Sequence, residues 1–164
     1  MNIKDKVDLL GSEQRLLGQL IYRNHNQHSS TELFSWIKAL NRNLKLLTTE
    51  KVHIVLTKLE SAVRNASNTK LSVIDLKDVC VAHTMAHGGI NLVSVCLDYC
   101  FKCSDCVRRL LGKKVFLPLY SMLLAISSRI FHCIKEIHDH LYIQASALTT
   151  QLKVRYSTIT TPSL

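Results

Sequence analysis

The sequence predicts an all-α protein, an elongated helical bundle of about five helices with a long last helix. The 164 residues include only 5 Gly and 2 Pro, which leaves few positions for tight turns. Helix-forming residues such as Leu, Ala and Lys dominate the long segments between them. With 47% hydrophobic and 20% charged residues, a chain of this length can bury a core in one domain.

The first helix is expected over residues 4–24, because Val7, Leu10, Leu17 and Ile21 recur at helical spacing. It either ends in the polar run 23–28 or continues through it. Ser29 and Glu32 then have the spacing of a capping box, which predicts a second helix from Ser30. Its apolar stripe is Leu33, Ile37, Leu40, Leu44 and Leu47.

Thr48 or Thr49 can cap a third helix, whose apolar positions run from Val52 to Val63. Residues 65–70 are the most loop-like stretch of the chain. The spacing of Ser72 and Asp75 predicts the start of a fourth helix.

The fourth helix is expected to kink or break briefly at Gly88-Gly89 and to continue towards Gly112. Pro118 is compatible with the first turn of a long final helix. The apolar stripe of that helix is Leu119, Leu123, Ile126, Ile130, Ile134, Ile137, Leu141, Ala145, Leu148 and Leu152. We therefore expect one helical domain over residues 1–153 and a frayed tail over residues 154–164.

The net charge of +9 and the isoelectric point near 9.4 favour an anionic partner, of which nucleic acid is the commonest. Charged residues interrupt the start of the chain, so no secretory signal is expected and the protein should be intracellular. The longest apolar run, 115–126, is too short to span a membrane, and no membrane partner is expected.

The polar run between the first two apolar segments contains guanidinium, amide and imidazole groups but no carboxylate. Its members include Arg23, Asn24, Asn26, Gln27 and His28. Such groups pair with phosphates, sugar hydroxyls and base edges, so the run predicts either an RNA-contacting surface or a buried polar junction between helices. We expect a mixed outcome, with Asn26 and His28 mainly structural and Arg23 and Gln27 mainly in contact with a partner.

A second basic cluster lies near the end of the fourth helix. It consists of Lys102, Arg108, Arg109, Lys113 and Lys114, opposed in that window only by Asp105. The cluster predicts either an electrostatic RNA contact or a solvated helix end whose bases complement the helix dipole.

Cysteines at positions 96, 100, 103 and 106 could suggest a metal site, but their spacing also fits one helical stripe. A rigid helix cannot wrap four thiolates around one ion, so we expect buried free thiols, no metal and no cofactor. His83 and His87 lack the glutamate of a metalloprotease motif. No residue pattern indicates catalysis, and the protein is predicted not to be an enzyme.

The segments Ser12 to Leu17 and Tyr22 to His28, together with Trp36, resemble the opening helices of the ribonuclease MRP-specific protein subunit family of fungi. The animal counterpart of that family is the nucleolus and neural progenitor protein. A second block, from Arg109 to Arg129, resembles a later part of the same family. The resemblance covers most of residues 9–137.

The resemblance implies an α-helical, non-catalytic subunit of a ribonucleoprotein in the nucleus and nucleolus. Its partners would be MRP RNA, the other protein subunits of the ribonuclease MRP/P complex and, indirectly, precursor rRNA. Carried over residue by residue, the polar run matches the first motif with Trp36 as its packing partner, and Gly112, Pro118 and Arg129 match the second.

One departure from the pattern is that some relatives carry a Lys-rich C-terminal tail, whereas the last residues here are almost neutral. Nucleolar delivery would then depend on assembly with partners. The alternative function is a helical adaptor that binds only proteins; a helical metalloenzyme is the third class.

Overall fold

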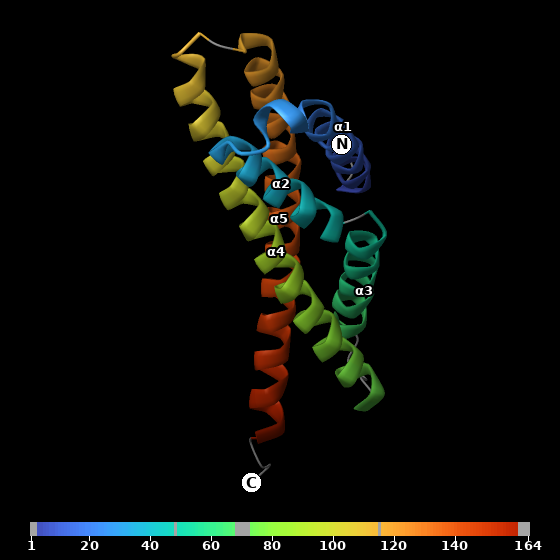
Figure 1. The fold of residues 1–164 in the computed structure, drawn as a ribbon. Helices are drawn as coiled ribbons and strands as arrows, with labels where there is room; N and C mark the ends of the chain where they lie inside the picture. Colours follow the sequence, from blue (N-terminus) through green and yellow to red (C-terminus); the bar gives the residue numbers. More distant parts are fainter. Residues whose placement is uncertain (1–2, 48, 68–72, 115, 161–164) are drawn as a thin grey trace.

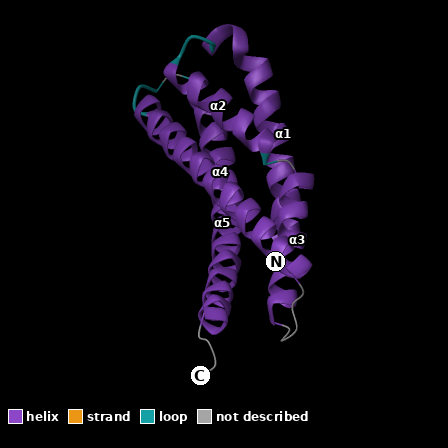
Figure 2. Cartoon of the chain, turned by 90° about the horizontal axis from the view of Figure 1, so that it is seen from below, coloured by secondary structure: helices purple, strands orange, loops and turns teal. Residues whose placement is uncertain are grey.

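The computed structural model describes residues 3–47, 49–67, 73–114 and 116–160. The helices are α1 (Ile3–His28), α2 (Glu32–Leu46), α3 (Thr49–Ser67), α4 (Val73–Leu111) and α5 (Leu117–Thr160). Figures 1 and 2 show an elongated bundle, and the described residues contain no strand. The predicted fold class, with about five helices and a long last one, is confirmed.

The centre of the bundle is the pair formed by the two longest helices, α4 and α5. Helix α4 ends at Leu111 and α5 begins at Leu117, and the two helices run antiparallel (Figure 1). Helix α1 packs against α5, α2 packs against α4, and α3 contacts both central helices. The three shorter helices therefore cover one side of a long helical hairpin.

The apolar stripes predicted for α2 and α5 form much of the core. On α5, Ile130, Ile134 and Leu148 are fully buried. Burying each such side chain contributes about 1.5–3 kcal/mol relative to leaving it exposed. On α4, Phe101 is 63% exposed and its ring contacts that of Phe131 on α5.

The start of α2 differs from the prediction. The capping residue is Thr31, whose Oγ1 accepts a hydrogen bond from the backbone N–H of Phe34 at 3.4 Å. Ser29 cannot cap α2, because its backbone N–H donates to His25 O at 2.9 Å and it thus closes the last turn of α1. Helix α1 accordingly continues through the whole polar run.

Of the kink or short break expected at Gly88-Gly89, the break does not occur, because α4 is continuous from Val73 to Leu111. A Cβ added to Gly89 would lie 3.6 Å from Leu141 Cδ1, which places this part of α4 close against α5. A glycine costs about 1 kcal/mol in a helix relative to alanine. Packing against α5 outweighs that cost.

The segment expected as a frayed tail, 154–164, is helical as far as Thr160. Residues 161–164 lie outside the described part of the chain. The loop-like stretch 65–70 is replaced by helix up to Ser67, and the predicted start of α4 at Ser72 falls outside the described residues.

Two helical stretches, Lys77–Leu111 and Leu117–Val154, are long and apolar enough to cross a bilayer by length and composition alone. Core helices of soluble bundles have the same property. Helix α5 also places Glu136 and Arg129 in ion pairs with α1, at 2.8 Å each. Charged groups paired in this way suit a helix packed within a protein bundle.

Candidate nucleic-acid interface

The polar run occupies the last turns of α1 and divides into an exposed part and a buried part. Arg23, Asn26 and Gln27 are exposed. Asn24 is half-buried, and its Nδ2 donates to Leu20 O at 2.9 Å. Asn26, which was expected to be mainly structural, is therefore exposed, as are Arg23 and Gln27, which were expected to contact a partner.

His28 is the buried member of the run, with 5% of its surface exposed. Its ring stacks on Phe34 at a centroid distance of 5.4 Å and meets Phe116 edge-on at 4.8 Å. Phe116 belongs to the turn between α4 and α5, where it and Lys114 have positive φ values of 53° and 54°. His28 thus packs the end of α1 against this turn, as expected for a structural residue.

Trp36 does not pack against the polar run. Its ring centroid lies 6.1 Å from that of Tyr99, and Lys102 Nζ lies 5.1 Å from the Trp36 ring centroid. The indole therefore connects α2 to α4, which corrects the expected pairing with the first motif.

An open groove runs between α1 and α2, with a volume of about 1320 Å³. The exposed residues Arg23 and Asn26 of the polar run belong to its α1 wall. The complete lining is Gln14, Arg15, Gly18, Gln19, Ile21, Tyr22, Arg23, His25, Asn26, Lys38, Asn41 and Lys45.

The groove has an amide floor because Gly18 has no side chain to fill it. Gln14 Nε2 donates to Asn41 Oδ1 at 2.9 Å, which joins the two helices across the groove. A Cβ at Gly18 would lie 3.8 Å from Asn41 Oδ1. A side chain at position 18 would therefore contact this amide pair directly.

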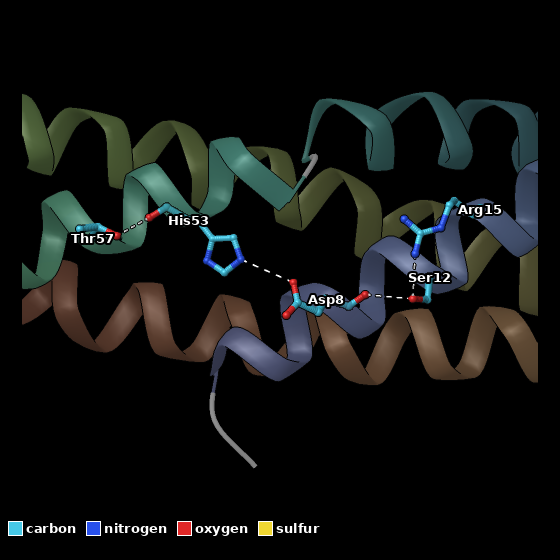
Figure 3. Close-up of polar contacts among 5 residues, drawn as sticks. All are labelled: Asp8, Ser12, Arg15, His53 and Thr57. Carbon is cyan, nitrogen blue, oxygen red and sulfur yellow. Dashed lines mark hydrogen bonds and ion pairs between the residues drawn. The ribbon is translucent and has the colours of Figure 1, made fainter.

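The groove is strongly cationic. Arg15, Arg23, Lys38 and Lys45 line it, and no carboxylate is among its described lining residues. Arg15 Nη2 donates to Ser12 Oγ at 3.1 Å (Figure 3), and Lys38 Nζ donates to Ser29 O at 3.3 Å. These neutral acceptors orient two of the cations without cancelling their charge.

Sequence reasoning missed most of this site. The lining residues Arg15, Tyr22, Lys38, Asn41 and Lys45 were not predicted as contact residues, although Arg15 and Tyr22 lie in the segments that carry the family resemblance. A signal was present, because Gln14, Gly18, Tyr22 and Asn26 recur at steps of four and form one ridge of α1. Only the position of α2 shows that this ridge faces Lys38 and Lys45.

The second basic cluster is partly neutralised by neighbouring carboxylates. Arg108 and Arg109 lie 3.0 and 3.4 Å from the oxygens of Asp105. Lys102 Nζ lies 2.6 Å from Asp98 Oδ2, and this hydrogen bond raises the pKa of Lys102. Lys113 and Lys114 are exposed in the following turn. The five cations of this cluster thus face two carboxylates, so its field is weaker than that of the groove.

Arg129 has a structural partner. Its Nε and Nη2 donate to the two carboxylate oxygens of Glu13 at 2.8 and 3.1 Å, so the pair is bidentate. The Glu13 side chain is 6% exposed and that of Arg129 is 51% exposed. We infer that Arg129 mainly compensates the buried charge of Glu13.

Four of the cysteines of α4 are core residues. Cys96, Cys100, Cys103 and Cys106 are free thiols and all are buried. Burial raises the pKa of Cys96 and of Cys103 to about 12, with the neighbouring Cys106 adding to the effect at Cys103. Thiols held neutral in this way are poor metal ligands and poor nucleophiles.

His83 and His87 lie close together near the far end of the α4–α5 pair. Their Nε2 atoms are 3.3 Å apart, and His83 Nε2 lies 2.8 Å from Thr149 Oγ1. Burial and the proximity of His87 lower the pKa of His83. Among the described residues, no group of three or more His, Cys, Asp or Glu side chains is placed to hold a metal ion.

These features define a basic α-helical bundle that presents a cationic, amide-lined groove between its first two helices. The chain belongs to the family described as nucleolus and neural progenitor protein, N-terminal, which matches residues 1–144. That match agrees with the animal side of the resemblance noted in the sequence. No curated protein and no solved structure matches the chain.

Proposed function

We propose that this protein is a non-catalytic RNA-binding and scaffolding subunit of the ribonuclease MRP particle, which supports precursor rRNA processing in the nucleolus. The observation that carries the proposal is the groove between α1 and α2, with four cations and no carboxylate among its described lining residues. Family membership supports the nucleolar setting. The resemblance of the polar run and the later block to the fungal MRP-specific subunits supports the particle.

RNA suits this groove for electrostatic reasons. Each phosphate that a cation neutralises releases counterions, and this release provides most of the affinity of non-specific binding. The amides of Gln14, Asn26 and Asn41 add hydrogen-bonding groups that can contact sugar hydroxyls or base edges. In this proposal the particle's RNA performs the cleavage, and the chain helps to hold and position it.

A protein-only adaptor is the second candidate function, and one observation favours it. Several large apolar side chains are exposed on the central helices, among them Phe101, Met122, Tyr142 and Ile143. Exposed apolar residues of this size are typical of protein contacts. In the proposed particle they serve the scaffolding role, by contacting other protein subunits.

Native purification of the full chain, followed by sequencing of bound RNA and identification of bound proteins, tests the proposal. Enrichment of MRP RNA together with ribonuclease MRP/P proteins is the expected result. Recovery of protein partners without RNA would favour the adaptor. Stoichiometric bound metal would instead support the helical metalloenzyme.

A further inference from the structure

The described lining residues of the groove between α1 and α2 include two aromatic rings, the imidazole of His25 and the larger ring of the Tyr22 side chain. This side chain is 86% exposed. The apolar side chains of a bundle usually face its core, whereas Tyr22 faces solvent beside Arg23 at the wall of a cationic groove. An exposed aromatic ring next to phosphate-binding groups is the combination that single-stranded nucleic acid requires.

We infer that the groove binds a single-stranded segment of RNA, with an unpaired base stacked on the ring of Tyr22. The inference rests on the proposed RNA-binding function and names the kind of RNA bound. Tyr22 follows Gly18 by four residues, so the two residues lie one turn apart on the same ridge of α1. The Gln14–Asn41 amide pair lies beside Gly18.

Cationic side chains on both walls of the groove can contact the phosphates of the strand. Arg15 and Arg23 lie on α1, and Lys38 and Lys45 lie on α2. The α1 wall extends from Gln14 to Asn26. At a rise of about 1.5 Å per residue it is roughly 18 Å long. A stacked strand advances by about 3.4 Å per nucleotide, so about five nucleotides fit.

The dimensions favour a polymer over a small molecule. Small-ligand sites are mostly apolar clefts of about 300–1,000 Å³. The volume here is about 1320 Å³, and most of the side chains that line it are polar or charged. A duplex would engage the cations from outside but would leave Tyr22 without an unstacked base.

Binding of a fluorescent uridine oligoribonucleotide of about twelve nucleotides, compared with a mixed-sequence RNA duplex of about the same length, tests the inference. We expect the full-length protein to bind the single strand more tightly. Tyr22→Leu should weaken single-strand binding by about 5- to 150-fold, the range found when stacking residues are removed. Tyr22→Phe should retain the affinity, because its ring can still stack.

Two substitutions at Gly18 test the location without changing the charge. Gly18→Ala adds only a Cβ at ordinary contact distance, 3.8 Å from Asn41 Oδ1, and should weaken single-strand binding less than a larger side chain does. Gly18→Leu extends further into the groove and should weaken single-strand binding, while circular dichroism shows the helical content of the wild type. If Gly18→Leu lost its helical content, Tyr22→Leu alone would decide the result.

The outcomes separate this inference from the proposed function. Equal binding of single strand and duplex, with no effect of Tyr22→Leu, would overturn the inference and leave RNA binding in place. Absence of binding to either RNA by the wild type at low salt would overturn the proposed function itself.

Discussion

Removing two cations from the groove should change how RNA binding depends on salt. The perturbation is the double substitution Arg23→Gln and Lys45→Gln, one on each wall. Both side chains are exposed, and neither forms an ion pair within the described part of the chain. Exposed substitutions of this kind usually change stability by less than about 0.5 kcal/mol. Any change in binding therefore reports on the RNA contact.

The magnitude follows from the number of phosphates contacted. For single strands the slope of log affinity against log salt is about −0.7 per neutralised phosphate, so four contacts give about −2.8. Affinity should then fall roughly 50-fold between about 50 and 200 mM KCl. With two contacts left, the slope should be about −1.4 and the fall roughly 7-fold.

Fluorescence anisotropy titrations at a series of KCl concentrations measure both slopes. Arg108→Gln with Arg109→Gln is the matched control, because it removes the same charge from cations that Asp105 already pairs. The control should keep a slope close to that of the wild type. A groove variant with an unchanged slope, or a control with the larger loss, would refute the assignment of the groove as the main contact.

Three further results are expected. Arg129→Met should lower the free energy of unfolding by about 1–3 kcal/mol in urea titrations, because it leaves the buried Glu13 carboxylate unpaired. RNA affinity should not change. An unchanged free energy of unfolding would contradict the structural role of Arg129. Near pH 8, a thiol reagent should modify Cys80 rapidly and the five buried cysteines only after unfolding, and fast modification of more than one thiol would contradict the packing. The pKa values of Cys96 and Cys103 are raised in the folded protein from 9.0 to about 12. The stability that these two thiols contribute is therefore complete below pH 9.0 and is lost as the pH rises to about 12. A melting temperature that stays constant over this pH window would contradict their burial.

The sequence was sufficient to predict which positions are buried where the apolar spacing within a single helix decides them. The stripe on α5 was predicted because its members repeat at helical spacing, and Ile130 and Ile134 are buried as expected. The start of α2 was not predicted correctly, because Ser29, Ser30 and Thr31 are all capable of capping a helix. The choice among them depends on where α1 ends, and that end is set by the packing of His28 on Phe34 and Phe116.

Features that depend on two helices could not be predicted from local pattern. The continuity of α4 at Gly89 depends on Leu141 of α5, far away in the sequence. The groove likewise needs the ridge of α1 that contains Tyr22 and the ridge of α2 that contains Lys38 to face one another. The polar run identified one wall of the site, while the other wall became visible only in the packed bundle.

Ultraviolet crosslinking of the native particle, followed by mass spectrometry of the crosslinked peptides, tests whether RNA lies in the groove between α1 and α2. We expect nucleotide adducts on the residues that line the groove, with Tyr22 prominent and MRP RNA as the crosslinked species. Crosslinks confined to the turn with Lys113 and Lys114, or an absence of RNA adducts on this chain within an intact particle, would contradict it.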